Sequence, residues 1–142
     1  MKYKTKKHVK SAWISRRNND RVTKKPWGHE IAWAGFDGIH GKTLHINDGQ
    51  RTSLKYHTLK SEVLFVRSGR AEIEFGDELS LTDPIGHPFK KEIVTAGCCL
   101  LTQGGSPYRI EALTECEIIE IGNHLSDKPI RIEDDYGRAD TE

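Results

Sequence analysis

The chain has 142 residues, of which 35% are hydrophobic and 30% charged, and its formal net charge is +1 at pH 7. This length suits one domain around a single core, and the apolar runs are too short to span a membrane, so we expect neither a second domain nor a membrane segment. The three cysteines, Cys98, Cys99 and Cys116, suit neither a disulfide framework nor a paired zinc site. They predict reduced thiols packed in strands of a cytoplasmic protein.

The N-terminus is a basic arm, which we assign to residues 1–24. Residues 1–25 hold ten Lys or Arg and one acid, Asp20, which leaves 12 of the 22 basic and 20 of the 21 acidic side chains for the rest of the chain. No apolar segment of secretory type follows, so we expect no signal peptide. A basic arm can contact nucleic acid, but no nucleic-acid-binding pattern follows it. We expect a solvated arm, or one that docks on the acidic body or on a partner subunit.

Residues 25–125 show short strand patterns separated by Gly, Pro, Asn and Asp. No segment of ten or more residues has a helical stripe, and regular short strands without helices predict an all-β sandwich or barrel, for which a double-sheet jelly roll is a natural size match. The Ser68-Gly69 corner predicts a hairpin turn between two of the strands. The predicted strands are Glu30–Trp33, Lys42–Ile46, Ser53–His57, Glu62–Val66, Ala71–Phe75, Glu92–Val94, Cys98–Thr102, Tyr108–Ala112 and Glu117–Ile121.

Two segments lack a strand pattern. Residues 77–91 contain two prolines and predict a loop or covering flap. Residues 126–142 are rich in acids and turn-forming residues, which predicts a C-terminal segment packed on the domain with its last residues disordered.

The stretch from Gly49 to Gly69 carries the residues with the most chemistry. At the strand period of two, Lys55 and His57 share one face of a strand, and Glu62 lies on one face of the next. If these strands pair, an amine, an imidazole and a carboxylate converge on one interior point. Buried charges need a partner, a metal or a substrate to offset their lost hydration. The cluster predicts either a functional site or an internal ion pair.

Two motifs in this chain resemble those of the cupin superfamily, G-x5-H-x-H-x4-E-x6-G and G-x5-P-x-G-x2-H. The spacing matches throughout, while Lys55, Gln103 and Tyr108 are substitutions. The matching positions are Gly49, Lys55, His57, Glu62 and Gly69 in the first motif, and Gly97, Gln103, Gly105 and Tyr108 in the second. The resemblance implies a double-stranded β-helix (jelly-roll) cupin barrel.

Within that superfamily the chain resembles the cupin part of type II mannose-6-phosphate isomerases, which is often fused to mannose-1-phosphate guanylyltransferase. Three stretches carry the likeness, namely Lys25-Pro26-Trp27-Gly28, Thr52-Ser53-Leu54 followed by His57 and Glu62, and the run PIRIEDDYGR from Pro129 to Arg138. The resemblance implies interconversion of mannose 6-phosphate and fructose 6-phosphate, or of a related sugar in carbohydrate metabolism. By analogy it also implies a homodimer.

The metal site of those isomerases is only half retained. They hold a divalent metal with Gln, His, Glu and His ligands, and the corresponding positions here are Lys55, His57, Glu62 and Tyr108. His57 and Glu62 could still hold a metal of the Zn, Mn or Fe class. A protonated lysine does not bind a metal, and placing it beside a divalent cation costs like-charge repulsion. In a second interpretation, the Lys55 ammonium takes the place of the cation and neutralises Glu62.

A third interpretation is proton transfer without a metal. It resembles the chemistry of metal-independent cupin epimerases and ketoisomerases that act on nucleotide-linked sugars. His57 would abstract a proton beside a carbonyl, Lys55 would stabilise the enolate, and Tyr108 would act as the acid. A non-catalytic sugar-binding or regulatory cupin with a degenerate metal site is also open.

The expected ligand in each case is a sugar phosphate or a nucleotide sugar, with no nucleic-acid or membrane partner. A guanidinium fork suits a phosphate group, and Arg138, within the closing motif, is the predicted contact, with Arg51 as a further candidate. Arg109 follows Tyr108 on its strand and is predicted to point outward. His45 is predicted to be a core histidine, with a place in the cavity lining, reached from a neighbouring strand, as the alternative.

Overall fold

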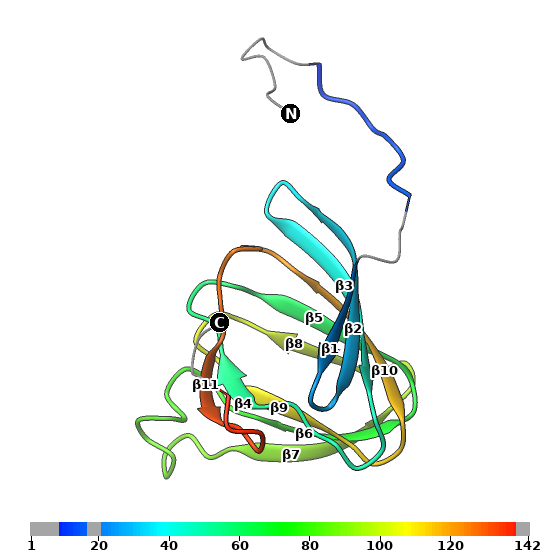
Figure 1. Ribbon diagram of the computed structural model, residues 1–142. Helices are drawn as coiled ribbons and strands as arrows, with labels where there is room; N and C mark the ends of the chain where they lie inside the picture. The colour runs from blue at the N-terminus through cyan, green and yellow to red at the C-terminus, as the bar shows by residue number, and fades with distance from the viewer. Residues whose placement is uncertain (1–8, 17–20, 139–142) are drawn as a thin grey trace.

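The computed structural model describes residues 9–16 and 21–138 and contains eleven β-strands (Figure 1). Their bounds are β1 Val22–Lys25, β2 Gly28–Phe36, β3 Ile39–Ile46, β4 Leu54–Tyr56, β5 Glu62–Ser68, β6 Arg70–Phe75, β7 Lys90–Thr95, β8 Cys99–Thr102, β9 Tyr108–Ala112, β10 Cys116–Gly122 and β11 Ile130–Glu133. Each of the nine predicted strands overlaps one of these. In the part of the chain that is described, no helix exists that could cross a membrane.

The strands form two antiparallel sheets. The larger has the order β1-β2-β3-β10-β5-β8 and the smaller has the order β11-β4-β9-β6-β7. Figure 1 shows the hairpin of β2 and β3 extending beyond the rest of the larger sheet. At its tip Asp37 and Gly38 both have positive φ, 51° and 75°, as expected for a two-residue turn whose twist matches that of the strands it joins.

The core lies between the sheets, because alternate residues of each strand point inward. On β5, Leu64 and Val66 are each 1% exposed, whereas Val63 and Phe65 between them are 39% and 37% exposed. The other strands contribute in the same way, and the core comprises Trp27, Leu44, Ile46, Leu64, Val66, Ala71, Ile73, Tyr108, Ile110, Ala112, Cys116 and Ile118.

The strands that carry Lys55 and Glu62 are not paired with each other, contrary to the antiparallel pair expected from the sequence. β4 belongs to the smaller sheet and β5 to the larger one. The connection after Tyr56 crosses from one sheet to the other, and His57 lies on it just beyond the end of β4. The side chains of His57 and Glu62 still meet, because the two sheets face each other.

The Ser68-Gly69 corner is not a hairpin turn, since β5 and β6 also lie in different sheets. The chain turns sharply there, with Gly69 at φ 89°. A Cβ atom at this position would lie 2.2 Å from the carbonyl oxygen of Glu115. Only glycine allows the backbones to approach this closely in that conformation. The corner therefore moves the chain between sheets.

Two strands were missed in the sequence, and both lie at sheet edges. β1 uses residues 22–24 of the predicted arm, and β11 lies within the predicted C-terminal segment, where it pairs with β4. The disorder expected at the last residues concerns residues 139–142, outside the described part. All three cysteines are free, but Cys98 and Cys99 are exposed and only Cys116 is packed inside, which corrects the expectation that all three are packed.

The two faces of β5 give a matched test of this packing. Leu64→Ala should lower the free energy of unfolding by about 2–5 kcal/mol, because it leaves a cavity in the core. Val63→Ala, on the outer face of the same strand, should cost about 1 kcal/mol or less. Urea denaturation of both variants would measure the difference, and equal losses would contradict the alternation described for β5.

Candidate functional site

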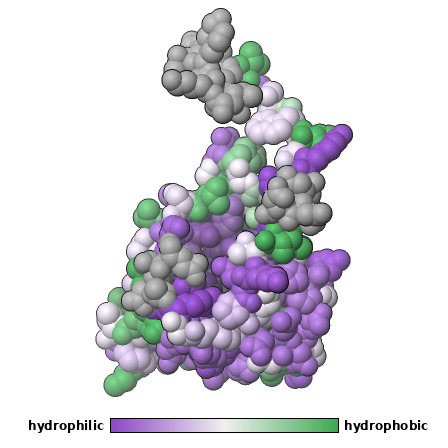
Figure 2. All heavy atoms as spheres, viewed as in Figure 1, coloured by the Kyte–Doolittle hydropathy of each residue, from purple (hydrophilic) through white to green (hydrophobic). Residues whose placement is uncertain are grey.

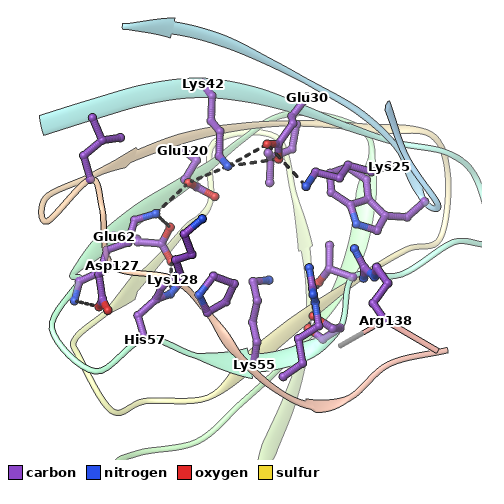
Figure 3. Close-up of a pocket in the computed structure, with 18 of the residues that line it drawn as sticks. Lys25, Glu30, Lys42, Lys55, His57, Glu62, Glu120, Asp127, Lys128 and Arg138 are labelled. Atoms are coloured by element: carbon purple, nitrogen blue, oxygen red, sulfur yellow. Dashed lines mark hydrogen bonds and ion pairs between the residues drawn. The ribbon is translucent and has the colours of Figure 1, made fainter. Parts of the chain in front are cut away.

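A cavity of about 480 Å³ lies between the sheets (Figure 3). Strands of both sheets line it, and the segment between β10 and β11 borders it. Its charged residues are Lys25, Lys42, Lys55, Lys60, Lys128, Arg131 and Arg138 on the basic side, and Glu30, Glu62, Glu120 and Asp127 on the acidic side. Seven basic side chains against four acidic ones favour an anionic ligand.

The acidic residues deep in the cavity are neutralised by lysines. Lys60 Nζ lies 3.4 Å from Glu62 and 3.7 Å from Glu120. Lys42 Nζ lies 3.6 Å from Glu120 and donates hydrogen bonds of 3.2 and 3.1 Å to the two carboxylate oxygens of Glu30. Figure 3 shows the contacts of Lys42 with Glu30 and Glu120 as dashed lines. An ion pair this deeply buried is retained only when its partners offset the lost hydration.

Glu62 and Glu120 respond to this environment in opposite directions. Burial alone would raise the pKa of Glu62, but the Lys60 ammonium and a 2.7 Å hydrogen bond from the Tyr108 hydroxyl lower it below its ordinary value. Burial, together with the negative charge of Glu62, raises the pKa of Glu120. Glu62 is therefore the anionic member of the pair, and Glu120 is the one that holds a proton more readily.

His57 is a neutral imidazole at the edge of this network. Its side chain is 7% exposed, and its Nδ1 lies 3.8 Å from Glu62. Burial lowers the pKa of His57 to about 4, and the ammonium groups of Lys60 and Lys55 add to this effect against the attraction of Glu62. At neutral pH the ring can therefore accept a proton, which is the property required of a base.

Lys55 does not neutralise Glu62, which corrects the second interpretation drawn from the sequence. Lys60 does so instead. In the register of β4 and β9, Lys55 lies opposite Tyr108, and its Nζ is 4.6 Å from the centroid of the Tyr108 ring. No carboxylate of the described residues lies within 4.0 Å of this amine. Burial lowers its pKa, although Glu62 and Glu120 oppose the shift.

Tyr108 lies beneath the cavity and does not line it. The residue is 2% exposed, and its hydroxyl is committed to Glu62. Burial and the adjacent carboxylate charges raise the pKa of its phenol well above the ordinary value. The structure thus brings Lys55, His57, Glu62 and Tyr108 together, with Tyr108 as the floor.

Arg138 lines the cavity. Its guanidinium is held by Asp134, with a 2.8 Å hydrogen bond from Nη2 to Oδ1. Arg109 does not line the cavity, in agreement with the prediction that it points outward from the barrel, and it is nevertheless only 4% exposed. Its Nη2 lies 3.6 Å from Asp135, in the segment that follows β11. This C-terminal segment covers it.

Arg51 and His45 also lie away from the cavity lining. Arg51 pairs with Asp135, and the Arg51 Nη2 to Asp135 Oδ1 distance is 2.9 Å. His45 is not a core residue, because its side chain is 22% exposed and its Nε2 lies 2.9 Å from the exposed Glu115.

The sequence did not point to several residues that complete the site, namely Glu30, His40, Lys42, Lys60 and Glu120. Glu120 left a readable signal, since it interrupts the apolar run of β10 at an inward position, between Ile118 and Gly122. Lys60 left none. It lies in the connection between β4 and β5, and only the tertiary fold brings its side chain to the carboxylates.

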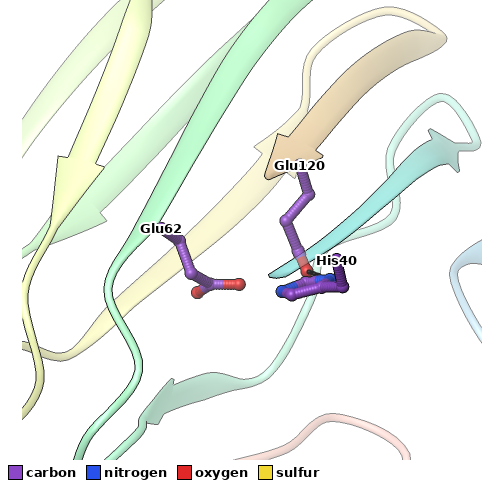
Figure 4. Close-up of side chains that lie close together, drawn as sticks. All are labelled: His40, Glu62 and Glu120. Atoms are coloured by element: carbon purple, nitrogen blue, oxygen red, sulfur yellow. Dashed lines mark ion pairs between the residues drawn. The ribbon is translucent and has the colours of Figure 1, made fainter. Parts of the chain in front are cut away.

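The residues at the family's metal positions do not fit a metal, because an ammonium group and a committed phenol replace two of the ligands. A different group has suitable donors. His40, Glu62 and Glu120 can each offer one donor atom, and these three atoms lie within 4.8 Å of one another (Figure 4). His40 Nε2, Glu62 Oε2 and Glu120 Oε2 are buried without a hydrogen-bond partner among the described residues. Nitrogen and oxygen donors suit a divalent cation, although Lys60 already supplies positive charge there.

Comparison with solved structures identifies the fold. KdgF from Halomonas sp. matches with a TM-score of 0.64 and 12% identity, over 80% of this chain and 94% of that one. An uncharacterised Klebsiella pneumoniae protein with a double-stranded β-helix domain matches with a TM-score of 0.60 and 14% identity, over 84% of this chain and 86% of that one. A variant of oxalate decarboxylase from Bacillus subtilis matches at 0.70 and 12%, over 88% of this chain and 34% of that one. The chain has the cupin fold.

At these identities the likeness is one of fold, and the finer resemblance to mannose-6-phosphate isomerases is not supported by it. No family profile matches the sequence, and no curated protein matches it. The cupin barrel that the motif spacing implied is confirmed.

The assignment of Lys60 as the counterion of the carboxylates can be tested. Lys60→Met should lower the free energy of unfolding at pH 7 by about 3–5 kcal/mol, because it leaves buried negative charge uncompensated. Lys55→Met is the matched control and should cost less, since Lys55 has no carboxylate partner among the described residues. Adding Glu120→Gln to Lys60→Met should restore part of the loss. Urea denaturation would measure the free energy of unfolding of all three variants. A larger loss from Lys55→Met than from Lys60→Met would contradict the assignment of Lys60 as the counterion.

The low pKa of His57 predicts a pH dependence of stability. In the unfolded chain this histidine takes up a proton near pH 6.5, but in the folded protein only near pH 4. The unfolded state therefore binds more protons between these values, and this contribution to stability is lost as the pH falls through that window. His57→Gln should lose less stability than the parent over the same range. NMR titration of the ring should find it neutral at about pH 5.5, between the two values, and a protonated ring there would contradict the burial described.

Proposed function

We propose that this protein binds a phosphorylated or nucleotide-linked sugar in the cavity and isomerises it by proton transfer between side chains. The observation that carries the proposal is the composition of the cavity, in which an excess of cations surrounds a neutral imidazole, an amine and a coupled pair of carboxyl groups. A volume of about 480 Å³ falls in the range of small-molecule sites.

The anionic part of the ligand would lie against the C-terminal segment. Lys128 and Arg138 both line the cavity from this segment, and Lys128 is exposed to an incoming ligand. Asp134 holds one edge of the Arg138 guanidinium, which fixes its plane for a phosphate group. Figure 2 shows that the face of the molecule turned to the viewer is mostly hydrophilic.

The carbonyl part would reach the inner end of the cavity. His57 would take the proton from the carbon beside the carbonyl, and negative charge would collect on the carbonyl oxygen, near the Lys55 amine. Returning the proton to the former carbonyl carbon, while Glu120 relays a proton between the two oxygens, completes an aldose–ketose interconversion. Tyr108 would act as a positioning residue through Glu62, in place of the acid role predicted from the sequence.

A metal-assisted isomerase is a second candidate. One observation favours it, the three buried donor atoms of His40, Glu62 and Glu120 that lack hydrogen bonds among the described residues. A divalent cation held there would act as a Lewis acid toward a sugar oxygen. Lys60 would have to move away from both carboxylates, because its ammonium lies 3.4 Å from one and 3.7 Å from the other.

The homodimer inferred by resemblance stays a proposal. The outer face of the larger sheet would be a suitable surface for a second copy. Strand register places Val63 beside Leu101 and Ile121 there, and the three side chains are 39%, 72% and 42% exposed. A cytoplasmic location likewise remains a prediction.

The proposal predicts proton exchange that survives chelation. With mannose 6-phosphate in D₂O, NMR should show deuterium entering the carbon beside the carbonyl at a rate unchanged by a chelator, and unphosphorylated mannose should react more slowly. His57→Ala should lower the rate by about 10²–10⁴. His45→Ala, which changes a histidine outside the cavity, is the matched control and should leave the rate unchanged.

Elemental analysis separates the alternatives. Stoichiometric metal that is lost in His40→Ala, together with turnover abolished by chelator, would overturn the metal-free mechanism in favour of the second candidate. Binding of the sugar phosphate without deuterium exchange would make the protein a binding cupin.

A further inference from the structure

We propose that Lys55 is a nucleophile that forms an imine with the carbonyl group of the bound ligand. This inference rests on the proposed function for the class of ligand, and adds a covalent step that neither the fold nor the sequence motifs assign. It is carried by the placement of the Lys55 amine, which differs from that of every other lysine in the cavity.

The other lysines of the cavity are paired or exposed. Lys60 contacts Glu62 and Glu120, Lys42 contacts Glu30 and Glu120, and Lys25 lies 4.0 Å from Glu30. A lysine whose N–H groups are committed to a carboxylate is poorly placed to attack a carbonyl carbon. Lys128 is exposed to solvent at the border of the cavity.

Lys55 lacks such a partner. Among the described residues, no carboxylate oxygen lies within 4.0 Å of its Nζ, and the group that faces the amine is the Tyr108 ring, with the centroid 4.6 Å away. In Figure 3 the side chain extends from its strand into the cavity without a dashed contact. A partly buried amine that lies against an aromatic ring and lacks a carboxylate partner is the kind that enzymes use as a nucleophile toward carbonyl compounds.

The position of Lys55 is fixed by the fold. β4 holds its backbone between β11 and β9, where Lys55 lies opposite Arg131 on one side and Tyr108 on the other. The Tyr108 ring is anchored in turn by its hydroxyl, which donates to Glu62. The amine therefore rests on a rigid floor, as an attacking group requires.

The step balances with groups that the cavity contains. The neutral amine adds to the carbonyl carbon, a C–N bond forms, and the π electrons of the carbonyl pass to its oxygen, which takes the proton that nitrogen gives up. The C–O bond then breaks as water leaves with a proton supplied by Glu120, and a C=N bond remains. Amine, carbonyl and the Glu120 carboxylic acid thus give a protonated imine, water and the Glu120 carboxylate, and hydrolysis reverses the step without any further reactant.

The imine would strengthen the chemistry of the same site. A protonated imine withdraws electrons from the adjacent carbon more strongly than a carbonyl does, which makes the proton on that carbon easier to remove. His57 is the base in the same cavity, and lies two residues from Lys55 along the chain. The covalent bond would replace the purely electrostatic role of Lys55 in the proposed isomerisation.

Reductive trapping tests the proposal. The folded full-length protein is incubated with glyceraldehyde 3-phosphate and cyanoborohydride, and labelled lysines are identified by peptide mass spectrometry over time. Lys55 should be labelled faster than any other lysine, by on the order of tenfold or more. Glycerol 3-phosphate, which carries the phosphate but no carbonyl, should slow labelling of Lys55 and leave the labelling of surface lysines unchanged.

Two variants serve as controls. Lys55→Arg keeps the positive charge but cannot form an imine, and should lose the fast label while still binding glycerol 3-phosphate in calorimetry. Lys91→Arg, on the exposed strand β7, should leave the fast label in place. Circular dichroism of both variants would establish that the fold is retained.

The outcomes separate this proposal from the function on which it rests. Binding of glycerol 3-phosphate with no preferential label on Lys55 overturns the imine and leaves the anion-binding function standing. Preferential labelling of Lys60 or Lys128 also overturns the proposal that Lys55 forms the imine. A fast label on Lys55 in a protein that neither binds glycerol 3-phosphate nor exchanges protons supports the nucleophile and counts against the isomerase.

Discussion

Two buried carboxyl groups, those of Glu62 and Glu120, lie on the neighbouring strands β5 and β10, and the interior of the protein is arranged around their charge. Two carboxylates this close cannot both ionise without compensation. Lys60 supplies it to both, and Lys42 supplies it to Glu120 and links it to Glu30. Because a buried charge costs several kcal/mol when unpaired, this network determines which side chains remain available for chemistry.

The residues that remain are His57 and Lys55. His57 borders the network but stays neutral, because burial outweighs the attraction of Glu62. Lys55 stands on the Tyr108 ring without a carboxylate partner among the described residues. Together with the exposed Lys128 at the border of the cavity, this base and this amine suit an anionic sugar with a carbonyl group. The composition of the cavity, more than the fold, supports the function proposed.

The cupin fold explains how residues from distant parts of the sequence reach one cavity. The connection after β4 and the Gly69 corner after β5 both carry the chain from one sheet to the other. Each crossing places neighbouring segments of sequence on opposite walls, so that Lys55 and Glu62 face each other from two sheets. KdgF and oxalate decarboxylase are similar to this chain in fold, and chemistry on such a scaffold depends on the side chains placed in it.

The sequence by itself determined the strands and the barrel, because an alternating apolar pattern and glycine corners are local features that act within a few residues. Its strand spacing also placed Lys55, His57 and Glu62 in one group, to which the motif resemblance added Tyr108. The sequence could not decide which lysine pairs with the buried carboxylates. Lys60 and Lys55 are equally polar in the sequence, and only the packing of the two sheets brings the Lys60 ammonium to Glu62 and sets Lys55 over an aromatic ring. The physical reason is that electrostatic pairing depends on distances of a few ångströms across the cavity, and those distances exist only after the sheets have closed on each other.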